Sequence, residues 1–191
     1  MIAYLANRIA DFIYLNINLP QDERDVYVYG YEIIISSAIT FVLLITTGLV
    51  FDRLIESIVF FVVFYSLRQR TGGYHADTYF KCNLIFELNV LLVMLLSCLD
   101  ISIIMQIVAN LAAFLLCLIT TIIKAPISNP NKPISSDMKI KHKMWAVVLL
   151  VFFELCALIG FDRRSISICI SLAMASTAIA MIITHERRKS A

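Results

Sequence analysis

The chain has 191 residues, of which 60% are hydrophobic and 16% are charged, and its mean hydropathy is +0.85. A soluble domain carries roughly 25% charged residues, so this composition excludes an ordinary soluble protein and predicts an all-α integral membrane protein. The net charge of +2 says little, because the position of each charge matters more than the sum in a membrane protein. Five cysteines without a CxxC pair argue against a disulfide framework and a zinc site, and we expect neither metal nor cofactor.

The chain opens with an amphipathic segment over positions 2–17. Apolar residues recur at helical spacing from Ile2 to Ile13, while Arg8 and Asp11 lie elsewhere on the helical wheel. This pattern predicts an amphipathic helix in the membrane interface that stops before Pro20. The segment lacks a cleavable signal pattern, so we expect it to be retained.

Six apolar runs follow, at roughly 33–51, 54–67, 84–99, 101–123, 144–160 and 166–184. The first is long enough to cross about 30 Å of hydrocarbon. The second is short and contains Glu56, so it should cross with the help of flanking polar residues or local thinning of the bilayer. The loop 124–143 holds three prolines and cannot be one continuous helix. We find no internal repeat and treat residues 1–191 as a single polytopic domain.

The positive charges are unevenly divided between the two sides that six spans would define. Thirteen of the sixteen Lys and Arg residues fall on one side, and Arg53, Arg163 and Arg164 fall on the other. The positive-inside rule makes the richer side cytoplasmic. Both termini, the loop 124–143 and the stretch 68–82 should then face the cytoplasm, where Cys82 would be a free thiol.

The stretch 68–82, RQRTGGYHADTYFKC, concentrates polar residues in a chain that is otherwise a series of apolar runs. Polar groups lose solvation free energy when they lie beside the hydrocarbon of a bilayer, so a functional site is the default interpretation of such a cluster. A thiol becomes a useful nucleophile when a base removes its proton and positive charge favours the thiolate. Within this stretch, His75 and Cys82 could form such a pair.

The spacing of seven places His75 and Cys82 on one face of an ideal helix, but about 10 Å apart along its axis, too far for a hydrogen bond. A backbone break at Gly72-Gly73, with Asp77 or Thr78 as the N-cap of a following helix, would let His75 fold back over Cys82.

Cys82 would then lie near the positive end of that helix, and Lys81, Arg68 and Arg70 would add positive charge. Each part also has a structural explanation. A glycine pair is more often only a turn, a histidine at a membrane boundary is usually interfacial, and an arginine often anchors a helix end. The combination is more specific than its parts.

This combination resembles the accessory gene regulator B (AgrB-like) family, membrane cysteine endopeptidases that process quorum-sensing pro-peptides. The motif reads Arg68, Gly72, Gly73, His75, Ala76 and Cys82. The resemblance extends over nearly the whole chain, from the N-terminal amphipathic segment to a basic, proline-containing loop, APISNPNKPI, ahead of the last two runs. It implies a multi-pass protein of the bacterial cell membrane.

The resemblance implies that His75 acts as general base and Cys82 as nucleophile, forming an acyl-thioester whose capture by a peptide side chain gives a thiolactone or lactone. Arg68 and the backbone of Gly72-Gly73 are candidate oxyanion donors. Asp77 could orient His75, although capping is the more expected role.

The implied partner is an AgrD-like precursor peptide. Membrane lipids and a second copy of the chain are further expected partners, and nucleic acid is not. Candidate substrate contacts are Lys81, Glu87, Lys132 and Lys139. The lysine-rich loop could equally serve only to fix topology.

Three polar residues inside apolar runs, Glu87, Asn89 and Glu154, should face the bundle interior or a water-filled groove, most simply as interhelical hydrogen-bonding groups. Two other classes of function stay open. In a small peptide transporter, Glu87 and Glu154 would line a path. In a non-enzymatic membrane partner, Cys82 would be lipidated or inert.

Overall fold

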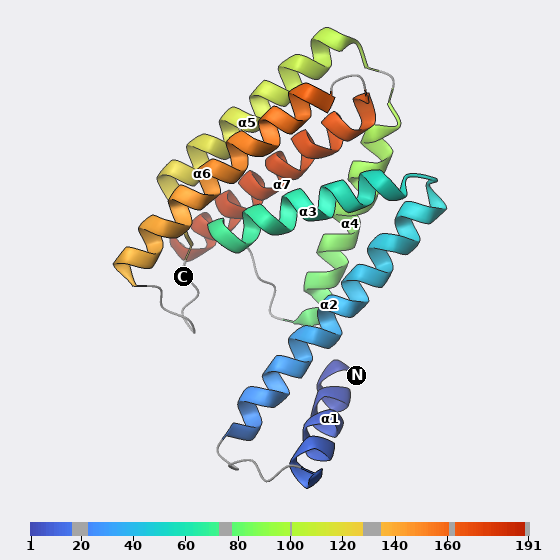
Figure 1. Cartoon of the computed structure of the whole chain (residues 1–191), viewed down its shortest axis with the longest axis vertical. Helices are drawn as coiled ribbons and strands as arrows, with labels where there is room; N and C mark the ends of the chain where they lie inside the picture. Colours follow the sequence, from blue (N-terminus) through green and yellow to red (C-terminus); the bar gives the residue numbers. More distant parts are fainter. Residues whose placement is uncertain (17–22, 73–77, 100, 128–134, 161–162, 190–191) are drawn as a thin grey trace.

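The structure, a computed structural model, describes residues 1–16, 23–72, 78–99, 101–127, 135–160 and 163–189. Seven helices occupy these ranges (Figure 1). They are α1 (Ile2–Asn16), α2 (Arg24–Val50), α3 (Leu54–Thr71), α4 (Tyr79–Ser97), α5 (Ile103–Lys124), α6 (Ser136–Ile159) and α7 (Arg164–Lys189). The described residues contain no strand, which confirms the all-α prediction.

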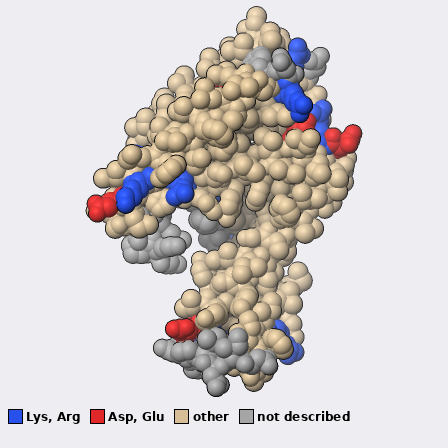
Figure 2. Space-filling model, viewed as in Figure 1, with Lys and Arg blue, Asp and Glu red and all other residues tan. Residues whose placement is uncertain are grey.

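Five of these helices, α2 and α4 to α7, are long and apolar enough to cross a membrane. The sixth expected crossing corresponds to α3, which has only 18 residues and includes Glu56, Arg68 and Arg70. Figure 2 shows charged side chains gathered toward the extremities of the molecule, with other residues making up the surface between them. The chain is therefore a multi-pass membrane protein with about six crossings.

Helix α7 forms the centre of the bundle. It contacts α3, α4, α5 and α6. Half of the residues in its apolar 18-residue stretch are buried, whereas the share is 22–28% in the corresponding stretches of the other four candidate spans. Its buried face includes Ala173 and Ala178, and such small side chains let neighbouring helices approach closely in a membrane. The position of α7 thus determines where the surrounding helices pack.

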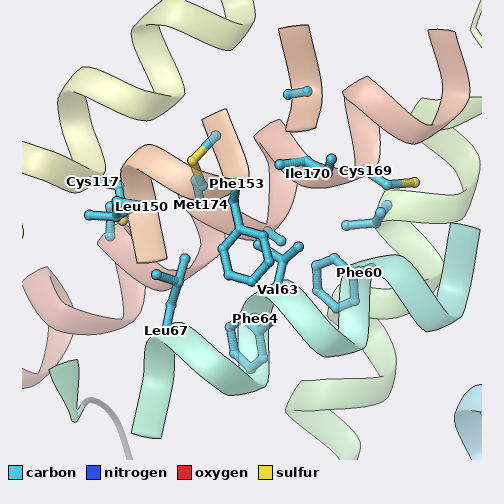
Figure 3. Packing of buried hydrophobic residues seen from close by; sticks show 14 of the residues in the cluster. Phe60, Val63, Phe64, Leu67, Cys117, Leu150, Phe153, Cys169, Ile170 and Met174 are labelled. Carbon is cyan, nitrogen blue, oxygen red and sulfur yellow. The ribbon is translucent and has the colours of Figure 1, made fainter. Parts of the chain in front are cut away.

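Helix α3 packs against this centre with an aromatic face. Phe60 and Phe64 stack with ring centroids 5.5 Å apart, and Phe86 of α4 lies 6.3 and 5.9 Å from them. Val63 and Leu67 are buried in the same cluster, together with Phe153, Met174 and others (Figure 3). This apolar contact orients the end of α3 that carries Arg68.

The bundle has two ends that differ in composition. At one, here called the cavity end, a cavity of about 530 Å³ is lined by residues of all three turns that meet there, among them Arg53, Cys98 and Arg163. At the other, here called the motif end, α3 ends and α4 begins. There Lys143 Nζ donates to the Ile122 carbonyl at 2.7 Å and Lys124 lies 3.8 Å from Glu186. The turns α2–α3, α4–α5 and α6–α7 thus lie at the cavity end, and the connections α3–α4 and α5–α6 begin and end at the motif end. This alternation is what six crossings require.

Helix α1 lies outside the bundle and contacts α2. Arg24 of α2 donates to Asp11 at 2.6 Å and to Asn7 at 3.0 Å. Figure 1 shows α1 and the first half of α2 side by side, projecting from the bundle. The predicted N-terminal amphipathic helix is confirmed, and it ends at Asn16, before Pro20.

Two predicted boundaries were wrong. The loop expected over 124–143 is shorter, because α6 begins at Ser136 and carries Lys139, Lys141 and Lys143 on its first turns. The last proline of the loop is residue 133, and beyond it nothing interrupts helical hydrogen bonding. Similarly, α2 begins at Arg24, well before its apolar run, since Tyr, Val and Glu are compatible with a helix.

Candidate functional site

Cys82 lies in the first turn of α4. Thr78 is the N-cap, with its hydroxyl accepting a hydrogen bond from the Lys81 N–H at 3.3 Å, and the Cys82 N–H donates to the Thr78 carbonyl at 3.0 Å. The expected helix N-terminus at this position is confirmed, with Thr78 as the cap. The half-buried Cys82 thiol therefore lies where the helix dipole favours negative charge.

Arg68 faces this thiol from the last turn of α3. It is half-buried, and its guanidinium lies 5.6 Å from the centre of the Phe64 ring. Its charge interacts with that of Cys82. An arginine stays protonated in a protein, so a fixed positive charge accompanies the thiol.

Gly72 ends α3 in a conformation that other residues rarely adopt. Its φ is +72°, and a Cβ there would lie 2.5 Å from the carbonyl oxygen of Ile127. The Ile127 N–H donates to the carbonyl of buried Thr71 at 2.9 Å. The segment that follows α5 is therefore fastened to the end of α3, and only glycine fits between them.

The Gly72 N–H donates to the Arg68 carbonyl at 2.9 Å. It is thus committed to the C-terminus of α3 and is not available as an oxyanion donor. At the start of α4 the Lys81 and Cys82 N–H groups are bonded to Thr78, so the first two amides of the helix, those of Tyr79 and Phe80, are the better candidates for that role.

Several predicted residues lie outside the described part of the chain: Gly73, His75, Ala76, Asp77 and Lys132. The structure gives no position for the expected base, and the distance between His75 and Cys82 stays a prediction. Lys81 and Lys139 are exposed at the motif end. Glu87 lies one helical turn after Asn83 on α4, and the Thr47 hydroxyl of α2 donates a hydrogen bond to Glu87 Oε1.

The three polar residues in the apolar runs face other helices, as expected. Besides the contact of Glu87 with Thr47, Ser176 of α7 donates to Asn89 Oδ1 at 3.1 Å. The amide nitrogen of Asn110, turned toward Glu154, donates to its two carboxylate oxygens at 3.1 and 2.6 Å. Interhelical hydrogen bonding explains these residues.

Sequence reasoning missed two contributors to this region, Asn83 and Ile127. Asn83 accepts hydrogen bonds from Ser36 and Thr40 of α2 at 3.0 and 3.2 Å. Its polarity next to Cys82 was the available signal. Ile127 acts through its backbone, which no residue pattern reveals.

The cavity end lacks this arrangement. Its cavity is lined by Arg53, Glu56, Cys98 and Arg163 among others, at the opposite end of α4 from Cys82. Within the described ranges, no group of three or more His, Cys, Asp or Glu side chains is placed to hold a metal ion.

The model of the accessory gene regulator B family matches residues 6–184. The chain belongs to this family. It is also 23% identical over 173 residues to AgrB-like protein 2 of Clostridium perfringens (strain 13 / Type A). The aligned region covers 83% of this chain and 78% of that protein. No solved structure matches.

Family membership supports a role in the accessory gene regulator system, in the processing of a quorum-sensing peptide at the membrane. The resemblance based on the motif from Arg68 to Cys82 is thereby confirmed at the level of the family. Five helices that are long and apolar enough to cross a membrane agree with that role.

Proposed function

We propose that this AgrB-family protein is a membrane cysteine endopeptidase that cleaves an AgrD-type precursor peptide through an acyl-thioester on Cys82. The observation that carries the proposal is the position of the Cys82 thiol in the first turn of α4, where the helix dipole favours negative charge. The positive charge of Arg68, at the end of α3, acts in the same direction.

In the first step His75 takes the proton of the Cys82 thiol, and the sulfur attacks the carbonyl carbon of the scissile bond. The Tyr79 and Phe80 amides at the start of α4 and the Arg68 guanidinium are the candidate donors for the resulting oxyanion. Collapse breaks the C–N bond, and protonated His75 returns the proton to the leaving amine. The C-terminal part of the precursor departs, and its N-terminal part remains as a thioester on Cys82.

In the second step neutral His75 takes the proton of a thiol or hydroxyl of the bound peptide, and the resulting thiolate or alkoxide attacks the thioester carbonyl. The Cys82–carbonyl bond breaks, the sulfur leaves as thiolate, and the peptide closes into a thiolactone or lactone. Water competes for the same carbonyl. A half-buried thiol among apolar helices favours the intramolecular nucleophile.

Substrate recognition would involve the basic segment beside the motif. Because Ile127 is bonded to Thr71, the chain between α5 and α6 starts beside the end of α3. The lysines that follow, Lys132 and Lys139, and Lys81 on α4 are therefore candidates for contact with an acidic part of the precursor. On this proposal the motif end faces the cytoplasm, in agreement with its excess of Lys and Arg.

The decisive experiment is cleavage of the cognate precursor peptide in proteoliposomes, with the wild type compared with Cys82→Ala and Cys82→Ser. A peptide adduct on Cys82, detected by mass spectrometry, together with a loss of cleavage of at least about 10³-fold in both variants, is the expected result. Cys98→Ala is the matched control and should cleave normally. Unchanged cleavage by Cys82→Ala would remove the peptidase proposal and favour the transporter.

A further inference from the structure

The contact between α2 and α4 includes a row of polar side chains. Tyr79, Asn83 and Glu87 occupy one face of α4 at intervals of four residues. Two of them have hydrogen-bond partners on α2: Asn83 accepts from Ser36 and Thr40, and Glu87 accepts from Thr47. We call this row the α2–α4 polar seam.

Asn83 is the centre of the seam. Its Oδ1 accepts from Ser36 Oγ at 3.0 Å and from Thr40 Oγ1 at 3.2 Å, and its Nδ2 lies 3.5 Å from the Ser36 carbonyl oxygen. Ser36 is buried. Such hydrogen bonds are directional, whereas an apolar contact tolerates rotation and sliding of one helix against the other. Asn83 therefore fixes both the rotation and the register of α4 on α2.

Asn83 directly follows Cys82 in the chain. In a helix, successive side chains point about 100° apart, so fixing the direction of Asn83 toward α2 also fixes the direction of the Cys82 thiol. Arg68, which interacts with Cys82, belongs to α3, a helix that contacts α2 and α4. A rotation of α4 would take the thiol away from that charge.

We propose that Asn83 is a positioning residue for Cys82, holding the nucleophile at its working angle through Ser36 and Thr40 of α2. The proposal rests on the proposed function for its catalytic consequence. Its geometric consequence, the reactivity of the thiol, can be measured without any peptide.

The test compares Asn83→Leu with Asn89→Leu in proteoliposomes. Asn89 is an equally half-buried asparagine on α4 that also accepts a hydrogen bond from another helix, at 3.1 Å from Ser176, but it is remote from Cys82. Because small misplacements of a reacting group cost up to about 100-fold, Asn83→Leu should lower kcat for precursor cleavage by roughly 10- to 100-fold while KM changes less than about threefold. Asn89→Leu should keep kcat within about twofold.

Two further variants separate positioning from a loss of folding. Ser36→Ala with Thr40→Val removes both donors without altering α4 and should reproduce the kcat of Asn83→Leu. Asn83→Asp retains the acceptor oxygen and should restore most of the activity. If the double variant is normal, or if Asn83→Leu and Asn89→Leu lose activity equally and in step with their unfolding temperatures, the proposal is overturned.

The second readout is alkylation of Cys82 by iodoacetamide as a function of pH, followed by mass spectrometry of the Cys82 peptide. Asn83→Leu should change the rate and its pH profile, whereas Asn89→Leu should leave both unchanged. This measurement distinguishes the two proposals. If the wild type fails to cleave the precursor, the proposed function is overturned. Independently of that result, an alkylation profile that changes in Asn83→Leu supports the positioning role, and a profile that does not change overturns the positioning role.

Discussion

The two ends of α4 each carry a cysteine, and their surroundings are opposite. Cys82 lies in the first turn, below the Thr78 cap and in reach of the Arg68 charge. Cys98 is the C-cap, exposed, and lines the cavity at the other end of the bundle. A helix stabilises negative charge at its N-terminus and opposes it at its C-terminus. The comparison teaches that the position of a thiol on its helix, more than exposure or a nearby cavity, identifies the candidate nucleophile.

The largest expected effect comes from removing the base. His75→Ala should lower precursor cleavage by about 10²- to 10⁴-fold, the usual contribution of a general base. Cleavage in proteoliposomes measures it, with His142→Ala, a histidine on α6, as the control. If His75→Ala cleaves normally while Cys82→Ala does not, Cys82 works without this histidine and the proposed pair is wrong.

The next effect concerns the glycine between α3 and the segment after α5. Gly72→Ala places a Cβ 2.5 Å from the Ile127 oxygen at a φ of +72° and should cost about 1–3 kcal/mol of stability. Thermal unfolding in detergent measures this cost. Gly30→Ala is the matched control, because nothing lies within 4 Å of its Cβ position, and it should be neutral or slightly stabilising. Equal unfolding temperatures for both variants would contradict the fastening of Ile127 to α3.

Neutralising Arg68 should sharpen the contrast between the two thiols. Arg68→Gln removes the positive charge that interacts with Cys82, and a partly buried pair of this kind contributes about 1 kcal/mol, so alkylation of Cys82 at neutral pH should slow by roughly 3- to 10-fold. Alkylation of Cys98 should be unchanged. In Arg53→Gln, a change at the cavity end, Cys82 should react as in the wild type. A Cys82 rate that ignores Arg68 would leave the helix N-terminus as the main influence on the thiol.

The smallest effect comes from the helix caps. Thr78 caps α4 and Ser102 caps α5, each accepting a backbone N–H at 3.3 Å, and replacement of either by alanine should cost about 1 kcal/mol of stability. The two variants should have similar unfolding temperatures, yet only Thr78→Ala should slow the alkylation of Cys82. Slower alkylation in Ser102→Ala would mean that the rate follows general stability.

Much of the fold could be predicted from the sequence because the signals are local. Apolar runs identify spans, and Thr78, two residues after Ala76 of the motif, is of a residue type that caps helices. The N-terminal boundaries of α2 and α6 were missed because polar but helix-compatible residues extend a helix beyond its apolar run.

The motif around Cys82 could also be predicted, since it is a short pattern of rare residues in an apolar chain. What could not be predicted is long-range: the approach of Ile127 to Gly72 and the pairing of Asn83 with Ser36. These contacts join residues 47 or more positions apart, and no periodicity encodes them. They depend on how the helices pack, which is known only once the whole bundle is assembled.

The central place of α7 has a consequence for biogenesis. The ribosome completes α3, α4, α5 and α6 before α7, yet all four pack against it. The earlier helices therefore enter the membrane without the surface that will hold them together, and Phe60, Val63 and Met174 can form one cluster only once α7 has inserted. A chain without α7 would lack the centre of its bundle, so the proposed peptide-processing site is completed only after α7 has been made.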